Sequence, residues 1–229
     1  MTDRMAEVWP AAALQFRSGD LELRWMDDHL ALAVADVAVR GIHDADYMPF
    51  NTPWTQGTPD EIRRSVLYWI WTMRGTANSP NPHLTLAVLI NGEPAGIQSL
   101  VASEWRTLRE ISTGSWLGRE FQGSGVGTRM RALSIRASFE GLGATQVTSG
   151  AFTDNAASNR VSSKLGYELD GIERGVFQGR ARTTQRYRLT RERWEELRSH
   201  HDAVLGAPVE LLGCAELLEQ LEQAPESMG

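Results

Sequence analysis

A glycine-rich segment in the middle of the chain has the composition of an anion-binding loop. It reads Gln122-Gly-Ser-Gly-Val-Gly127 and lies between a predicted strand, Glu110–Leu117, and a helix predicted from about Gly125 to Glu140. Glycines let backbone N–H groups converge on a ligand without side chains in the way. The first turn of the following helix adds unpaired N–H groups and partial positive charge. We therefore expect the segment to bind a pyrophosphate or a similar anion.

Two common phosphate-binding motifs do not fit this segment. A Walker A loop would continue with Gly-Lys-Ser or Gly-Lys-Thr, and neither follows. A dinucleotide-binding fingerprint would follow an early strand and precede an acidic residue at the end of the next one, whereas this chain reaches Asn155 there. A protein that uses the same glycines to bind ATP stays open as an alternative.

The bulk composition predicts a globular protein and excludes several classes. Of 229 residues, 41% are hydrophobic and 23% are charged, enough apolar residues for a core. The net charge of −6 argues against a nucleic-acid binder, which needs a basic surface. The sequence has no run of about 18 apolar residues, so no membrane span is predicted. The single cysteine, Cys214, excludes an internal disulfide framework and a Cys-rich zinc site. We expect a cytoplasmic protein without a metal, a membrane or a nucleic-acid partner.

The order of predicted elements indicates a mixed sheet with helices on both faces, an α+β or α/β fold. The chain begins with the strand Leu21–Trp25 and two helices, the second starting at the capping box of Thr58. A hairpin around Asn91-Gly92 comes next, followed by the strand and helix that flank the glycine loop. A further strand, Gln146–Phe152, a helix behind Asn155 and a final hairpin around Gln178-Gly179 complete the pattern.

The same pattern divides the chain into a lead-in, a domain and a tail. Residues 1–19 form the lead-in, residues 20–195 the domain, and residues 196–229 a carboxyl-terminal tail. Within the tail, Val209–Leu212 predicts a strand and Glu216–Gln223 a short amphipathic helix. An exposed apolar segment of this kind often marks an oligomer contact. We expect the tail to make a homo-oligomer contact.

Three motifs resemble those of the GNAT superfamily of acyltransferases. The resemblance is closest to the RimJ/RimL-type branch and, within it, to succinyl-CoA-dependent members. The first is the Gln-x-x-Gly-x-Gly loop ending at Gly127, and the second is the run from Asn155 through Ser158 to Lys164-x-Gly-Tyr167. The third is Gly114–Gly118, which lies just before the glycine loop in the chain. The resemblance implies the GNAT fold, a mostly antiparallel sheet splayed between two parallel strands, here Glu110–Leu117 and Gln146–Phe152. It also implies an acetyl-CoA or succinyl-CoA donor and an amine acceptor.

The resemblance assigns donor-binding roles residue by residue. Trp116 and Leu117 would offer backbone groups to the pantetheine arm, and one N–H there would polarise the thioester carbonyl. Asn155 would bind the arm or only cap its helix, and both readings stay open. The predicted contacts to coenzyme A are Trp116, Leu117, Gln122, Gly123, Ser124, Gly125, Val126, Gly127, Thr128, Asn155 and Ser158.

Direct attack of an amine on a thioester needs a base for the ammonium and an acid for the leaving thiolate. Glu104 and Glu110 are the candidate bases, with Glu104 ranked first because it ends a strand near the expected acceptor side. The pair His43 and Asp44 is the second option. GNAT enzymes often carry a tyrosine acid at the position of Ser162, so the serine is a departure, and Ser158 is a further candidate contact to the sulfur.

An irregular segment from Gly41 to Trp54, rich in aromatic residues and proline, is predicted to form the acceptor pocket. Its candidate lining residues are His43, Asp44, Met48, Phe50 and Trp54. A succinyl donor would also need a cation, for which Arg106, Arg109 or His43 qualifies by charge. Two function hypotheses follow, an acyl-CoA:amine N-acyltransferase and a non-catalytic acyl-CoA-binding module. They differ in whether a titratable group lies beside the thioester.

Overall fold

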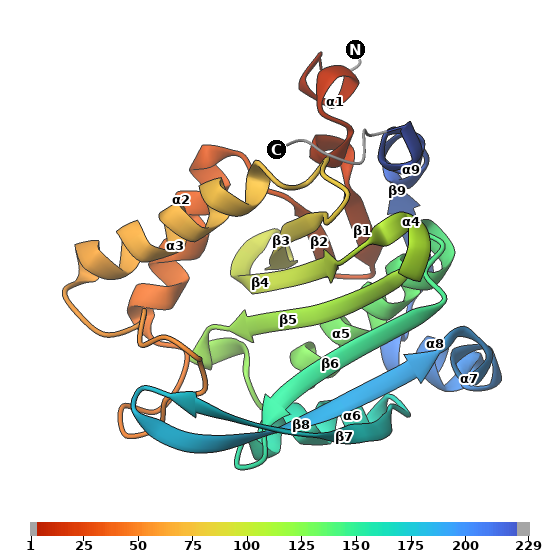
Figure 1. Cartoon of the computed structure of the whole chain (residues 1–229). Helices are drawn as coiled ribbons and strands as arrows, with labels where there is room; N and C mark the ends of the chain where they lie inside the picture. Colours follow the sequence, from red (N-terminus) through yellow and green to blue (C-terminus); the bar gives the residue numbers. More distant parts are fainter. Residues whose placement is uncertain (1–3, 224–229) are drawn as a thin grey trace.

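The computed structural model describes residues 4–223, which build a single mixed sheet with helices on both faces (Figure 1). The nine strands of this part of the chain lie in the order β7-β8-β6-β5-β4-β3-β2-β1-β9. Neighbours pair antiparallel except β5 and β6, which are parallel. The strands are β1 (Gln15–Ser18), β2 (Leu21–Trp25), β3 (His83–Ile90), β4 (Glu93–Ala102), β5 (Glu110–Leu117), β6 (Gln146–Phe152), β7 (Glu168–Phe177), β8 (Arg180–Thr190) and β9 (Val209–Leu212). The predicted fold class is confirmed.

Helices α2 (Asp28–Arg40) and α3 (Pro59–Arg74) cover one face of the sheet, hereafter the α2–α3 face (Figure 1). Both begin where the sequence predicts. The Asp27 side chain accepts a hydrogen bond from the Leu30 amide, and Thr58 forms the predicted capping box with Glu61. The residues of α3 that are buried against the sheet are Ile62, Val66 and Ile70.

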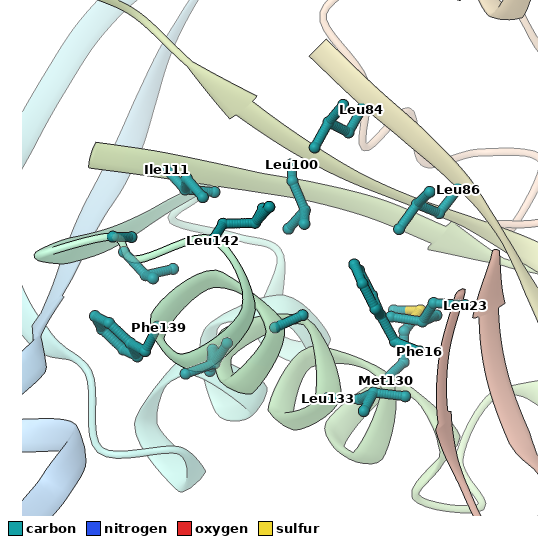
Figure 2. Packing of buried hydrophobic residues seen from close by; sticks show 14 of the residues in the cluster. Phe16, Leu23, Leu84, Leu86, Leu100, Ile111, Met130, Leu133, Phe139 and Leu142 are labelled. Atoms are coloured by element: carbon teal, nitrogen blue, oxygen red, sulfur yellow. The ribbon is translucent and has the colours of Figure 1, made fainter. Parts of the chain in front are cut away.

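The opposite face carries α5 (Val126–Arg136) and the main hydrophobic core, so we call it the α5 face. Figure 2 shows side chains of α5 and its extension meeting those of the sheet, for example Met130 and Leu133 near Phe16 and Leu23. The remaining helices are α1 (Arg4–Val8), α4 (Trp105–Leu108), α6 (Ala156–Lys164), α7 (Arg191–Glu196), α8 (Arg198–Leu205) and α9 (Cys214–Gln223), with short turns η1 (Pro10–Ala13), η2 (Arg119–Phe121) and η3 (Ala137–Gly141). The core holds β5 and β6 rigidly in place.

Described residues of the predicted lead-in and tail pack on the same sheet and core as the domain. β1 lies inside the predicted lead-in and pairs with β2 and β9. The predicted strand Val209–Leu212 is present, and the apolar side chains Leu217 and Leu221 of α9 are buried in the main core. The apolar face that suggested an oligomer contact is therefore covered by the chain itself, so this premise is corrected.

At Gly96, β4 and β5 approach each other closely. A Cβ atom added there would lie 2.1 Å from the Trp116 carbonyl oxygen, whereas one added at Gly114, on the facing strand, would meet nothing within 4 Å. We expect Gly96→Ala to lower the free energy of unfolding by about 1–3 kcal/mol, because the backbone must shift. Urea denaturation measures this, with Gly114→Ala as the matched control. An equal loss in both variants would contradict the packing explanation.

Candidate active site

The parallel strands β5 and β6 separate part-way along their length. Their last paired residues are Thr113 and Ser149, although β5 continues to Leu117 and β6 to Phe152. Beyond this point β5 stays paired with β4 on its other edge, and β6 with β8. We call the region between the diverging ends the fork. Its inner edges keep unpaired backbone groups, which can bind an extended ligand as an added strand would be bound.

The glycine loop closes the open end of the fork and is shaped to receive an anion. Gly123 and Gly125 have φ of 77° and 89°, in the region that favours glycine, and a Cβ on either would meet nothing within 4 Å. Gly125 is the N-cap of α5 and provides no side-chain cap. The amides of Val126 and Gly127 come before the first helical hydrogen bonds and remain free by helix geometry. The loop therefore presents bare N–H groups at the positive end of α5.

Two predicted ligand contacts hold the loop instead of facing the fork. The Gln122 side-chain amide donates to the carbonyl oxygens of Ile42 and Leu117, both at 2.8 Å. This side chain fastens the loop to β5 and to the end of α2, and the predicted role of the loop in ligand binding concerns its backbone amides. The Ser124 hydroxyl donates to the Phe121 carbonyl at 3.3 Å, and the Thr128 amide bonds to the Gly125 carbonyl at 3.1 Å.

Helix α6 begins beside the end of β6 and borders the fork. The Asn155 side chain accepts from the Ser158 amide at 3.2 Å, so Asn155 caps the helix. Ser158 is half-buried, whereas Ser162 is 1% exposed and its hydroxyl has no hydrogen-bond partner among the described residues. Asn159, which the sequence analysis missed, fastens α6 to the strand end through its amide and the Phe152 carbonyl at 3.0 Å.

The segment between α2 and α3 carries the predicted acceptor residues and leans over the fork. His43 contacts the Asp44 carbonyl at 2.8 Å and the Thr55 hydroxyl at 2.7 Å through its two ring nitrogens. A chain of ring contacts then runs from Phe50 to Trp54 and on to Trp116 of β5, with centroids 5.0 and 5.8 Å apart. The aromatic residues thus anchor this segment to the strand that forms one side of the fork.

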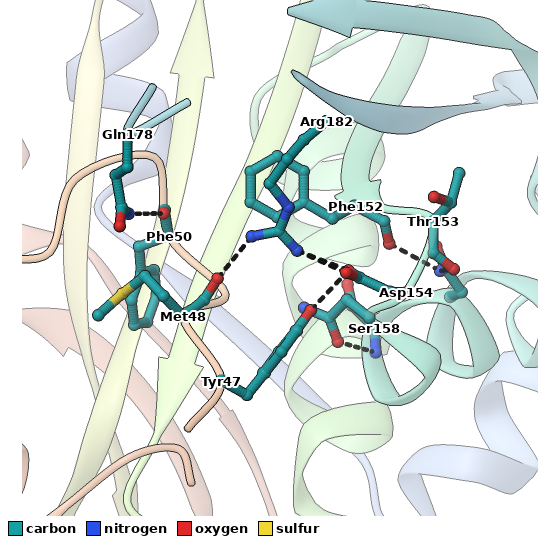
Figure 3. A network of polar contacts seen from close by, with 11 residues as sticks. Tyr47, Met48, Phe50, Phe152, Thr153, Asp154, Ser158, Gln178 and Arg182 are labelled. Carbon is teal, nitrogen blue, oxygen red and sulfur yellow. Dashed lines mark hydrogen bonds and ion pairs between the residues drawn. The ribbon is translucent and has the colours of Figure 1, made fainter. Parts of the chain in front are cut away.

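A polar network ties the same segment to the other side of the fork (Figure 3). Arg182 of β8 forms two hydrogen bonds with Asp154 at 2.7 and 2.8 Å, and donates to the Met48 carbonyl at 2.8 Å. The Tyr47 hydroxyl donates to Asp154 at 3.0 Å. The Arg182 guanidinium also lies 3.6 Å from the centre of the Phe152 ring. The hydrogen bonds that link Tyr47, Asp154 and Arg182 could not be predicted from the sequence, because no motif connects these positions.

Glu110 lies on the α2–α3 face in the first residue pair of β5 and β6, three residues before the last pair, and its carboxylate reaches along the strands as far as Thr148. Gln146 donates to one of its carboxylate oxygens at 2.7 Å and Thr148 to the other at 3.2 Å. Glu110 lines a small pocket whose other wall residues are Val101, Ser103, Leu108 and Ser112. Toward the fork this face continues with Ser112 and Thr148 and then with Gly114 and Gly150, which carry no side chains.

Glu104, the first-ranked candidate base, is not brought into this pocket. It is exposed in a left-handed turn at φ 48°, between the end of β4 and α4. Its backbone amide donates to Asn81, and the pocket walls do not include its side chain. Of the two candidate bases, only Glu110 lies on β5 and lines the pocket. The sequence analysis could not separate them, since each ends or begins a predicted strand.

Residues 20–168 match the acetyltransferase (GNAT) domain family, which is more than half of the chain. The chain belongs to the GNAT family. Its members transfer an acyl group from a coenzyme A thioester to an amine, so the protein is an acyl-CoA-dependent N-acyltransferase. The fork and the glycine loop are the parts of the fold that suit such a donor.

Solved structures of acetyltransferases share the fold. RimJ from Mycobacterium smegmatis, in complex with a coenzyme A disulfide, aligns at a TM-score of 0.70 and 19% identity over 88% of this chain and 97% of its own. RimL, a ribosomal L7/L12 α-N-protein acetyltransferase in complex with coenzyme A, aligns at 0.58 and 20% over 77% and 97%. The ribosomal-protein-S5-alanine acetyltransferase of Vibrio fischeri aligns at 0.62 and 17% over 79% and 98%. These similarities show that the chain shares its fold with RimJ and RimL acetyltransferases.

Three further observations concern the cysteine, the possible metal ligands and the helices of residues 4–223. Burial raises the pKa of the Cys214 thiol to about 11, so the thiol is protonated at neutral pH and is a poor nucleophile. Within residues 4–223, no group of three or more His, Cys, Asp or Glu side chains is arranged to hold a metal. In the same part of the chain, the helices are all too short or too polar to cross a bilayer.

Proposed function

We propose that the protein transfers an acetyl group from acetyl-CoA to a primary amine, with Glu110 as the base. The observation that carries this proposal is the pairing of a glycine-lined anion cradle at one end of the fork with a carboxylate pocket on the paired part of β5, before the strands separate. The first fits the pyrophosphate of coenzyme A, and the second fits an ammonium group. The open space over Gly123 and Gly125 supports the fit of the coenzyme to these residues.

The donor would lie with its pyrophosphate on the amides of Gly123–Gly127 and its pantetheine arm along the free edge of β5. Trp116 and Leu117 contribute backbone groups to the arm, and an N–H of this edge polarises the thioester carbonyl. Asn155 and Ser158 border the arm from α6. Ser158 and Ser162 are the hydroxyl groups proposed to contact the sulfur. Coenzyme A supplies the activated acyl group, and the protein supplies position and charge.

Acetyl is favoured over succinyl because of the charges around the fork. The carboxylate of Glu110 lines the pocket next to the fork and would repel a second carboxylate on the acyl chain. Two of the cations considered for a succinyl group are engaged elsewhere. Arg109 is paired with Glu222, and Arg106 donates to the Leu221 carbonyl, both in α9. His43 is occupied by the Asp44 carbonyl and Thr55.

The acceptor is proposed to be the amino terminus of a protein chain, which would contact the 41–58 segment. The α-N-acetyltransferase neighbours support this choice. Met48, Phe50, Trp54, His43 and Asp44 belong to the segment that would contact the acceptor. A small amine is the second candidate, and a panel of peptides and polyamines separates the two by kcat/KM.

Ligand-induced stabilisation tests the donor assignment directly. Acetyl-CoA at one hundred times its dissociation constant is expected to stabilise the protein by about 2.7 kcal/mol. ATP at the same concentration is the control, and it should produce little change, because the fork accepts an extended arm that ATP lacks. Stabilisation by ATP alone would favour a nucleotide-binding protein. Binding of acetyl-CoA without transfer to any amine would favour the non-catalytic module.

A further inference from the structure

Arg131 on α5 carries a buried positive charge at the apex of the fork. Its side chain donates from Nη1 to the Ser149 hydroxyl at 2.7 Å and from Nη2 to the Ser115 hydroxyl at 3.2 Å. Ser149 belongs to the last residue pair of β5 and β6, and Ser115 lies just beyond that pair on β5. The guanidinium therefore spans the two strands on the α5 face where they separate.

This guanidinium has no negatively charged partner among the described residues. Arg131 is 5% exposed, its side chain donates to the neutral hydroxyls of Ser149 and Ser115, and its Nε has no acceptor among the described residues. Tyr167 is the acidic group beside it. Burial raises the pKa of the Tyr167 phenol and the charge of Arg131 opposes this only in part, so the phenol stays neutral. A buried charge without a counter-ion is costly in a folded protein.

The Ser162 hydroxyl is buried and also lacks a hydrogen-bond partner within residues 4–223, whereas the buried Tyr167 hydroxyl lies beside Thr113 and Arg131. The two residues are linked by a hydrogen bond from the Tyr167 amide to the Ser162 carbonyl. Unsatisfied buried polar atoms thus come from Arg131 of α5 and Ser162 of α6. Native proteins satisfy nearly all such groups, so a set of this kind indicates a ligand that is yet to bind.

We propose that Arg131 is a catalytic residue that stabilises the thiolate leaving group of coenzyme A. The inference rests on the proposed function, because it requires the thioester to reach the apex of the fork. Glu110 lies on the α2–α3 face and Arg131 on the α5 face, so base and cation approach the apex from opposite sides. Ser162 replaces the tyrosine acid found in many relatives, and a fixed cation removes the need for a strong acid at this position.

The transfer step balances with these groups. Glu110 takes a proton from the ammonium, and the nitrogen lone pair forms a bond with the thioester carbon. The carbon–sulfur bond breaks, and its electron pair leaves with sulfur as a thiolate beside Arg131. The nitrogen loses its second proton to solvent as the amide forms. The thiolate takes a proton from water when coenzyme A is released.

Titration of the thiol in bound coenzyme A tests this proposal without requiring turnover. The protein is saturated with free coenzyme A, and the ultraviolet absorbance of the thiolate is followed as pH rises. We expect the pKa of the bound thiol to lie about 1–3 units below that of free coenzyme A, because a cation within a few ångströms favours the thiolate. An unshifted thiol in the saturated wild-type complex would overturn the proposal, independently of any variant.

Charge variants assign the shift to Arg131. Arg131→Met should abolish it, and Arg131→Lys should restore most of it. Arg129→Met is the matched control, because it removes the same charge from the same helix at a site paired with Asp20. If Arg131→Met does not fold, the lysine variant and the wild-type titration still decide the question.

A purely structural role for Arg131 predicts a different result. If the arginine only clamps β5 to β6, Arg131→Met should weaken coenzyme A and desulfo-coenzyme A equally at high pH. The proposal predicts that wild type prefers coenzyme A by about tenfold or more above the bound thiol's pKa, and that Arg131→Met loses this preference. Equal weakening of both ligands would overturn it. Failure of both ligands to bind wild type would instead contradict the proposed function.

Discussion

Replacement of Glu110 by glutamine is expected to lower kcat by about 10²–10⁴-fold with little change in the affinity for acetyl-CoA. The side chain keeps its shape but loses the ability to take a proton from the ammonium. Its carboxylate is held by Gln146 and Thr148, so the wild-type group is already in position before the substrate binds. Steady-state kinetics with a saturating amine, together with calorimetry of acetyl-CoA binding, gives the two quantities.

Glu104→Gln is the matched control for this experiment. It makes the same chemical change to the glutamate that lies in an exposed turn outside the pocket. The expected kcat is within about twofold of wild type, because surface charges contribute little. A large loss in Glu104→Gln with a small loss in Glu110→Gln would reverse the assignment. Loss of coenzyme binding in Glu110→Gln would indicate a structural role rather than proton transfer.

Replacement of Gly125 by valine is expected to raise the dissociation constant for coenzyme A by about 10–100-fold. Gly125 adopts φ 89°, a conformation that costs a β-branched residue about 1–3 kcal/mol. A valine would relieve this strain by moving the loop out of the shape that binds the anion, and about 1.4 kcal/mol lost in this way lowers the affinity tenfold. The new side chain would also occupy the space over the loop amides, where a Cβ now meets nothing within 4 Å. Calorimetric titration with coenzyme A measures the change.

The matched control for the loop is Gly143→Val. Gly143 has φ 74° and equally open surroundings, but it lies in the turn before β6, away from the loop. It should lose stability to a similar degree while its affinity for coenzyme A stays close to that of wild type. Equal losses of affinity in the two variants would mean that strain, rather than the anion cradle, controls binding.

Most elements of the fold could be predicted because their signals are local. The capping box at Thr58 and the turn residues Asn91-Gly92 determine structure within a few residues, and both are present as expected. The glycine loop is equally local, since positive φ at Gly123 and Gly125 follows from residue type and position between a strand and a helix.

The composition of the candidate site depended on contacts that no local pattern encodes. Glu104 and Glu110 are six residues apart in sequence, yet only the parallel pairing of β5 with β6 brings Gln146 and Thr148 to Glu110. The amphipathic pattern of the carboxyl-terminal helix α9 predicts an apolar face. The pattern does not determine whether this face is buried against another copy or against the same chain. In the structure, Leu217 is buried in the protein's own core.

The sequence by itself determined the elements, the anion-binding loop and the family resemblance, because backbone propensity and motif spacing are short-range properties. The tertiary structure alone decided which charges meet at the fork. Tyr47 reaches Asp154, and Arg131 reaches Ser149, only after strands and helices have packed. A buried cation is recognised as unpaired only when all of its neighbours are known, because its energy depends on every group around it rather than on its place in the chain.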